Sequence, residues 1–238
     1  MAGNSLVYSD CRSDNCDIWG MDLLTRKAFA ISAGPGDEGQ PATDGIRVVW
    51  RDSRNASSRN PDNLSSNFDV YGAYLDERKP FPLASGPRMQ NRPSVWGSTL
   101  VWADFRTAGG DRDPEAGDIY ISDFPTNKET PLAVARSAQV RPVTDGRYIV
   151  WADYRNEQSA NGPNSDIYGY DLQTRQEFVI SNAPDTQTDP AISDGTVVWT
   201  DFRNGDGADI YGYDLKTKQT FPVSTAPGSQ IEPAVASG

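Results

Sequence analysis

The chain has 238 residues and a formal net charge of −11, and 37% of its residues are hydrophobic. The negative charge argues against nucleic acid or an anionic membrane surface as a partner, because both attract clustered lysine and arginine. No apolar run approaches the roughly 18 residues of a membrane-spanning helix, so we expect no membrane insertion.

One pattern recurs along the whole sequence. Its clearest copy reads Ile-Val-Trp-Ala-Asp-Tyr-Arg over residues 149–155 and Asp-Ile-Tyr-Gly-Tyr-Asp-Leu over residues 166–172. Tryptophans mark four of the five copies at intervals of 48 to 52 residues, and Tyr8 takes their place in the first copy. A repeat that runs from end to end predicts a single domain over residues 1–238. The second strands of the five copies are expected near 6–12, 48–54, 100–106, 149–155 and 197–203.

The last complete copy predicts how each unit folds. An extended run over residues 187–193 is followed by Asp194-Gly195, a two-residue hairpin turn signal. Residues 196–203 are β-branched and aromatic, and two further strand patterns follow over 209–215 and 219–224. Four-stranded units of about 40–50 residues with repeated aromatic motifs are typical of β-propeller blades. We therefore predict an all-β fold, a five-bladed β-propeller of four-stranded antiparallel blades.

The two ends of the sequence fit into one blade. Residues 230–238 match an innermost strand, and residues 3–8 continue from the same turn into a second strand. We expect these terminal strands to share one blade, which closes the ring and leaves no unpaired edge. Gly238 is then expected to lie close to Gly3.

A Pro-x-x-x-Asp-Gly segment, a Trp-x-Asp-x-Arg segment and Asp-Ile-Tyr recur in register, and together they resemble the TolB-type (WD40-like, PD40-type) propeller repeat. The resemblance covers essentially the whole chain and implies the propeller fold. That family includes periplasmic scaffold and partner-binding proteins as well as propeller domains attached to hydrolases, so the resemblance leaves the function open. The sequence departs from TolB itself, since it shows no separate N-terminal α/β domain and five copies instead of six.

The two cysteines, Cys11 and Cys16, lie in one short loop. A zinc site needs about four ligands, and the chain has no histidine and no other cysteine. We expect a disulfide that closes a hairpin loop, with two free thiols as the alternative. A disulfide implies a secreted protein in an extracellular, cell-surface or periplasmic location.

Aspartate and arginine recur in the second strand of four copies, and another aspartate opens the third strand. We expect these repeated residues to be architectural, with the arginine bridging both carboxylates across the hairpin. Contact with a ligand is the alternative. The residues concerned are Asp52, Arg54 and Asp69, Asp104, Arg106 and Asp118, Asp153, Arg155 and Asp166, and Asp201, Arg203 and Asp209.

Function is expected where the copies differ. The residue before each innermost-strand proline should lie near the mouth of the central channel, and in four copies a glutamine stands two residues further back. Such a funnel of arginines, carboxylates and amides suits a carbohydrate or a peptide ligand. Mutual neutralisation of the charges around a water-filled channel is the alternative. The predicted ligand-binding residues are Gln40, Arg92, Arg141, Asp189 and Glu232, with Gln90, Gln139, Gln187 and Gln230.

The loops between second and third strands are longest in copies two to four, over residues 55–68, 107–117 and 156–165, and should raise a wall on the same face. Their Asn, Asp and Gly residues could coordinate Ca²⁺, but ordinary turn chemistry explains the same composition. We expect no cofactor. Trp96 replaces the turn aspartate on the opposite face, where it could stack on a sugar or a partner, or pack beneath a neighbouring loop.

The sequence favours a non-catalytic, monomeric binding module that uses the long-loop face and the channel mouth. An enzymatic alternative makes Asp189 and Glu232 the carboxylate pair of a glycoside-active enzyme. Against it, Arg92 and Arg141 would lower the pKa of a nearby general acid, and a chain without histidine cannot build an imidazole triad. A purely structural domain of a larger surface protein is the third possibility.

Overall fold

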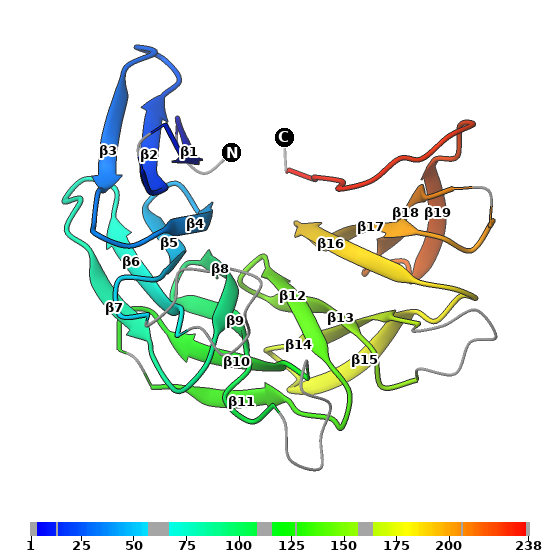
Figure 1. The fold of residues 1–238 in the computed structure, drawn as a ribbon. Helices are drawn as coiled ribbons and strands as arrows, with labels where there is room; N and C mark the ends of the chain where they lie inside the picture. The colour runs from blue at the N-terminus through cyan, green and yellow to red at the C-terminus, as the bar shows by residue number, and fades with distance from the viewer. Residues whose placement is uncertain are drawn as a thin grey trace.

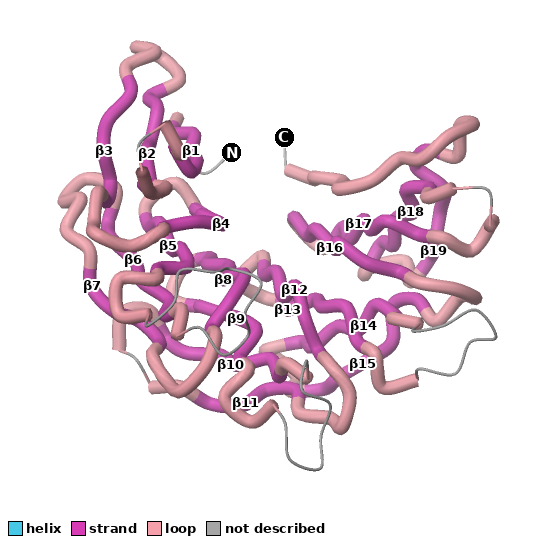
Figure 2. The backbone as a smooth tube through the Cα atoms, viewed as in Figure 1, coloured by secondary structure: helices cyan, strands magenta, loops and turns pink. Residues whose placement is uncertain are grey.

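The fold consists of antiparallel sheets. The computed structural model describes residues 4–12, 14–56, 67–108, 116–126, 128–156, 164–205 and 207–236. Within these ranges every regular element is a strand, and the strands form five sheets (Figure 2). No helix long and apolar enough to cross a membrane occurs in these ranges.

Each sheet carries its strands in chain order, from the centre of the molecule outward (Figure 1). The innermost strands are β4 (Glu38–Thr43), β8 (Gln90–Trp96), β12 (Gln139–Thr144) and β16 (Gln187–Ser193). The second strands are β1 (Ser5–Asp10), β5 (Arg47–Asp52), β9 (Thr99–Asp104), β13 (Tyr148–Asp153) and β17 (Thr196–Asp201). The third strands are β2 (Asp17–Asp22), β6 (Asp69–Tyr74), β10 (Asp118–Asp123), β14 (Asp166–Asp171) and β18 (Asp209–Asp214). The outer strands are β3 (Ala28–Ser32), β7 (Phe81–Ala84), β11 (Thr130–Ala133), β15 (Gln176–Ser181) and β19 (Gln219–Ser224).

The sheets stand around a common centre as the blades of a propeller, which confirms the all-β fold and the five antiparallel blades, four of them four-stranded. We number the blades one to five by their second strands, β1, β5, β9, β13 and β17. The predicted second strands run two residues too far at their C-terminal ends. Arg54 shows why: its backbone N–H donates to Asp52 Oδ1 at 2.8 Å, so the chain already turns there.

Neighbouring blades bury both faces of the second strands. In β9, β13 and β17 five of the six residues are buried. Each apolar cluster joins two adjacent blades; for example, Trp151 and Ile149 of β13 pack against Val101 and Ile119 of the preceding blade. Successive residues of a strand point to opposite faces, and here both faces are buried. This explains why the residues on both faces of the repeated motif are either apolar or polar with a hydrogen-bonding partner.

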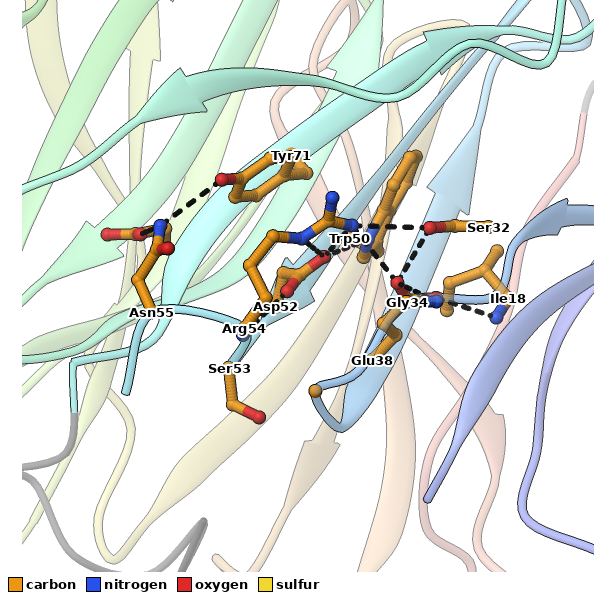
Figure 3. A network of polar contacts seen from close by, with 12 residues as sticks. Ile18, Ser32, Gly34, Glu38, Trp50, Asp52, Ser53, Arg54, Asn55 and Tyr71 are labelled. Carbon is orange, nitrogen blue, oxygen red and sulfur yellow. Dashed lines mark hydrogen bonds and ion pairs between the residues drawn. The ribbon is translucent and has the colours of Figure 1, made fainter. Parts of the chain in front are cut away.

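The Trp-x-Asp-x-Arg segment forms the same network in four blades. In blade two, Asp52 accepts hydrogen bonds from the Trp50 indole at 3.1 Å and from Arg54 Nη2 at 2.6 Å (Figure 3). The guanidinium of Arg54 lies 4.2 Å from the centre of the Tyr71 ring. Hydrogen bonding to Asp52 raises the pKa of Arg54. A fully buried carboxylate is thereby paired, which removes most of the cost of burying it.

The arginine does not bridge to the aspartate that opens the third strand, so that detail of the prediction is wrong. Asp69 accepts a hydrogen bond from Asn55 Nδ2 at 2.9 Å, and the same amide donates to the Tyr71 hydroxyl at 3.2 Å (Figure 3). In blade four, Asn156 Nδ2 likewise donates to Asp166 at 2.9 Å and to the Tyr168 hydroxyl at 3.1 Å. The arginine is stacked on the tyrosine ring, and the asparagine that follows it in sequence reaches the third strand. Burial raises the pKa of both aspartates.

The first blade lacks the innermost strand predicted for it, because β1 to β3 form a three-stranded sheet. Residues 225–236 form no strand (Figure 2). The backbone N–H of Gln230 donates to Ala208 O of blade five at 2.6 Å, a link between blades that recurs at Glu38, Gln90 and Gln139. The segment is thus docked as an innermost strand would be, but without pairing to β1. Gly3 and Gly238, the predicted neighbours, lie outside the described residues.

Candidate ligand site at the central channel

Five residues that precede a proline have a left-handed backbone. Their φ angles lie between 50° and 57°, and none of them is glycine. This conformation costs an L-residue about 1–3 kcal/mol and is free of strain only for glycine. In the four innermost strands the pairing register shifts at the same place, which marks a β-bulge that can redirect a side chain. The residues are Gln40, Arg92, Arg141, Asp189 and Glu232.

These five residues and the prolines that follow them line one central cavity of about 420 Å³. They come from four innermost strands and from the segment that follows β19, and are about 50 residues apart in sequence. The structure therefore brings together the channel-mouth residues that the sequence predicted to be neighbours. The bulge of the four innermost strands and the left-handed backbone of Glu232 place one amide, two guanidinium and two carboxylate side chains around the same opening.

Of the four charged side chains in the cavity, two form an ion pair with each other. Arg141 forms an ion pair with Asp189, and the backbone N–H of Arg92 donates to Gln40 Oε1 at 3.0 Å. Burial lowers the pKa of Arg92, and the charge of Glu232 opposes that shift. Burial also lowers the pKa of Arg141, and Arg92 lowers it further. Within the described residues neither Arg92 nor Glu232 forms an ion pair, so both charges remain available to a ligand.

The four predicted glutamines do not line the cavity, and the expectation that they bind a ligand is wrong in that respect. Gln90, Gln139 and Gln187 are fully buried. Gln187 Nε2 donates to the carbonyls of Ala183 and Asp185 at 3.1 and 2.6 Å, and Gln230 does the same in its own loop. Gln90, Gln139 and Gln187 precede the bulge and pair with the buried end of the second strand, so their amides lie against the connecting loop and not in the cavity.

Glu38 occupies this glutamine position in blade two. It is 1% exposed, and its Oε1 accepts hydrogen bonds from the Ser32 hydroxyl at 2.6 Å and from Arg54 at 3.1 Å (Figure 3). Burial raises the pKa of Glu38 above its ordinary value. The folded protein therefore binds a proton here more readily than the unfolded chain does.

Glu38→Gln should gain stability relative to wild type as the pH rises. A carboxyl whose pKa is raised on folding contributes its full stability below the unfolded pKa and loses it as the pH rises through the folded pKa. The glutamine variant lacks that loss, so we expect it to gain stability relative to wild type as the pH rises above the ordinary pKa of a glutamate. Urea unfolding across this range measures it. Glu77→Gln, on an exposed turn, is the control; a difference between Glu38→Gln and wild type that does not vary with pH would contradict the expectation.

The predicted loop wall lies largely outside the described residues, since residues 57–66, 109–115 and 157–163 fall in the gaps. The calcium expectation concerns those same loops. Among the residues that are described, no three acidic, cysteine or histidine side chains are grouped to hold a metal ion. Cys11 and Cys16 form a disulfide directly after β1.

Blades arranged around a polar central cavity define a β-propeller. The chain is similar in structure to TolB from Acinetobacter baumannii, with 18% identity and a TM-score of 0.66 over 97% of this chain and 54% of TolB. The β-propeller domain of the Trilobed protease from Pyrococcus furiosus gives 15% identity and a TM-score of 0.72, over 98% of this chain and 71% of that one. An oligogalacturonate lyase from Vibrio parahaemolyticus gives 12% identity and a TM-score of 0.64, over 93% and 62%.

The fold is therefore that of a TolB-like β-propeller, and the chain spans about half the length of the TolB chain that it matches. No protein-family model and no curated protein matches the sequence. At these low identities the likeness extends to the fold alone.

Proposed function

We infer that this chain is a non-catalytic binding module that holds a short peptide or a saccharide in the central cavity. The observation that carries this inference is the set of five left-handed residues. A glycine would relieve the strain at each position, yet all five positions have polar or charged side chains that line the same cavity. Strain kept at several positions around one opening is typical of ligand sites.

The unpaired charges favour a ligand that carries both signs. Arg92 can bind a carboxylate in a bidentate manner, and Glu232 can accept hydrogen bonds from an ammonium or hydroxyl group. Because the two charges lie on the same cavity, a short peptide whose two termini carry opposite charges, or a saccharide with both an amino and a carboxylate group, matches them best. The Arg141–Asp189 ion pair between them then fixes the shape of the wall.

Two features support binding without catalysis. Asp189, one of the two carboxylates that a glycoside-active enzyme would need, is held by Arg141. An adjacent cation favours the ionised form of a carboxyl, which is unsuited to a general acid. The 238-residue sequence also has no histidine.

We also propose that residues 230–236 pair with β1 and so close the ring. In this arrangement the segment supplies the innermost strand that blade one lacks, and Glu232 becomes part of a continuous wall. Support comes from the link between Gln230 and Ala208 and from the left-handed Glu232, which repeat the backbone of the four innermost strands.

The disulfide supports a location outside the reducing cytosol. Disulfides such as Cys11–Cys16 persist in oxidising compartments. We therefore propose a secreted, cell-surface or periplasmic module that acts as a monomer.

Arg92→Ala should weaken ligand retention at least about tenfold, as removal of a charge-assisted hydrogen bond does. Arg141→Ala should also weaken it, because Asp189 then loses the partner that fixes the wall of the cavity. The readout is an array of short peptides and oligosaccharides. The melting temperature should shift by only a few degrees, because alanine keeps the same backbone and loses contacts mainly to the cavity.

Arg175→Ala is the matched control, since Arg175 has the same left-handed backbone (φ 59°) in an exposed turn away from the cavity. It should retain the ligand. Unchanged retention in the cavity variants, or a large fall in their melting temperature, would make the two arginines structural.

A further inference from the structure

Trp96 stands at a turn where the flanking blades have aspartate. Asp44 of blade two accepts a hydrogen bond from the backbone N–H of Gly97 in blade three at 2.9 Å. Asp145 of blade four likewise accepts one from Gly195 of blade five at 3.1 Å. Between blades three and four the equivalent residue is Trp96, and its indole ring, in place of a carboxylate, contacts the turn of blade four.

The indole rests on a glycine. A Cβ atom added to Gly146 would lie only 2.4 Å from Trp96 Cδ1, so the ring occupies the space that any side chain at this turn would fill. Gly146 also has φ 88°, which favours glycine. The indole ring of Trp96 therefore packs against the backbone of Gly146, which holds it in one position.

Trp96 is nevertheless 40% exposed, whereas Trp50, Trp102, Trp151 and Trp199 are fully buried. An exposed tryptophan fixed in position is an unusual use of a large apolar side chain, since about 25 cal/mol is gained for each square ångström of apolar surface that is buried. Its exposed part borders a groove of about 810 Å³ between the turns of blades four and five. This volume lies within the range of small-ligand sites.

The groove offers one aromatic wall and balanced polar groups. Its lining includes Tyr148, Arg147, Asp194, Asp214 and Lys216. The Asp145 carboxylate also borders it but is occupied by three backbone N–H groups, including that of Tyr148 at 2.8 Å. Asp214 likewise accepts two backbone N–H groups at 2.8 Å, and Arg147 forms an ion pair with Asp171 at 3.5 Å. The lining has three carboxylates and two cations, so the groove presents donors and acceptors with nearly balanced charge.

We propose that this groove is a second binding site and that it takes a neutral oligosaccharide. A sugar ring has an apolar C–H face that packs on a fixed indole, and its hydroxyl groups both donate to carboxylates and accept from cations. Because the charges of the rim are nearly balanced, the groove does not favour an ionic ligand over a neutral one. The site is separate from the central cavity, since no residue lines both.

The probes are neutral oligosaccharides of glucose, of mannose and of N-acetylglucosamine, titrated into the full chain. Four of the six tryptophans are fully buried, so acrylamide quenching of the fluorescence reports on Trp96 and on the partly buried Trp19, and a Trp19→Phe background removes the second signal. At least one series should shift the emission to shorter wavelength and reduce quenching. Trp96→Ala should abolish the optical change and weaken the affinity, measured by calorimetry, about tenfold or more.

Arg92→Ala should leave binding in this groove unchanged, which separates the test from that of the central cavity. Asp194→Asn and Lys216→Ala change exposed turn residues and should weaken binding several-fold with unchanged circular dichroism. They keep the proposal testable if Trp96→Ala does not fold. The proposal is overturned if no oligosaccharide series changes the fluorescence, if Trp96→Ala or both turn variants keep full affinity, or if only peptides protect Trp96 from acrylamide.

Discussion

Replacing Asp153 by alanine should lower the free energy of unfolding by about 3–5 kcal/mol, the cost of breaking a buried ion pair from one side. Asp153 is fully buried and accepts hydrogen bonds from the Trp151 indole at 2.8 Å and from Arg155 Nη2 at 2.6 Å. The substitution leaves the buried Trp151 indole and the backbone N–H of Arg155 without their acceptor, while the Arg155 guanidinium keeps its second partner, Glu177, at 2.6 Å. Urea unfolding followed by circular dichroism measures the loss. Asp153→Asn, which keeps an acceptor for the indole, should lose less.

Asp10→Ala is the matched control, because Asp10 holds the same position in the first copy. Its partner Arg12 is 82% exposed, so the pair is screened by solvent and the loss should be much smaller. Similar losses at Asp10 and Asp153 would show that the stabilising effect does not depend on burial between blades.

The fold could be predicted because every blade must bury both faces of its second strand, and the sequence repeats the residues that do so. Val150 and Trp151 point to opposite faces of one strand and both are fully buried, which only a sheet covered on both sides requires. A single copy would have left a half-buried strand as an equal alternative. Recurrence at intervals of 48 to 52 residues removed that alternative and fixed the order of the strands.

The central cavity was predictable in part. The prolines mark one register position in every innermost strand, so the residues before them had to meet at the axis. The left-handed backbone at those residues and the bulge that follows are not visible in the sequence. Simple alternation along the strand therefore placed Gln187 at the channel mouth, whereas its amide is buried against its own loop.

Contacts between blades were the least predictable. Trp96 was visible as a break in the pattern, but its support, Gly146, comes from the next blade, 50 residues further along the chain. The contact between Trp96 and Gly146 depends on how two sheets pack, and composition and periodicity within one copy carry no information about it. Within blade two, Asn55 lies beside Arg54 in a loop and gave no sign of pairing with Asp69.

The proposed closure of the ring should allow a disulfide between cysteines placed at Ser9 and Ile231. The face of blade one that is turned toward blade five, and the face of blade five that is turned toward blade one, both carry exposed apolar side chains. Leu6 of β1 is 50% exposed, whereas its counterparts Val48 and Ile149 are fully buried. On the other side, Val223 of β19 is 54% exposed, whereas its counterpart Ile180 in β15 is 6% exposed. Pairing of residues 230–236 with β1 would bring the two faces together and bury both.

The register follows from the complete blades. Gln187 lies opposite Asp201 and Thr188 opposite Thr200, so Gln230 should lie opposite Asp10 and Ile231 opposite Ser9. A cross-link there closes a loop of 222 residues (231 − 9), for which chain entropy predicts a gain of about 5 kcal/mol. Non-reducing electrophoresis and peptide mapping should find the new disulfide beside the native Cys11–Cys16 pair, and urea unfolding should show the gain.

Cysteines at Ser9 and Ala234 are the control. The register places Ala234 opposite Val7, two residues from Ser9, so the side chains at positions 9 and 234 would not meet. They should stay reduced while the Ser9–Ile231 pair oxidises. If neither pair oxidises, and the backbone amides of β1 exchange hydrogen as fast as those of an unpaired edge, then residues 230–236 do not complete blade one. Glu232 would in that case face the cavity from a segment docked on blade five alone, and substitutions in β1 should leave ligand retention at the cavity unchanged.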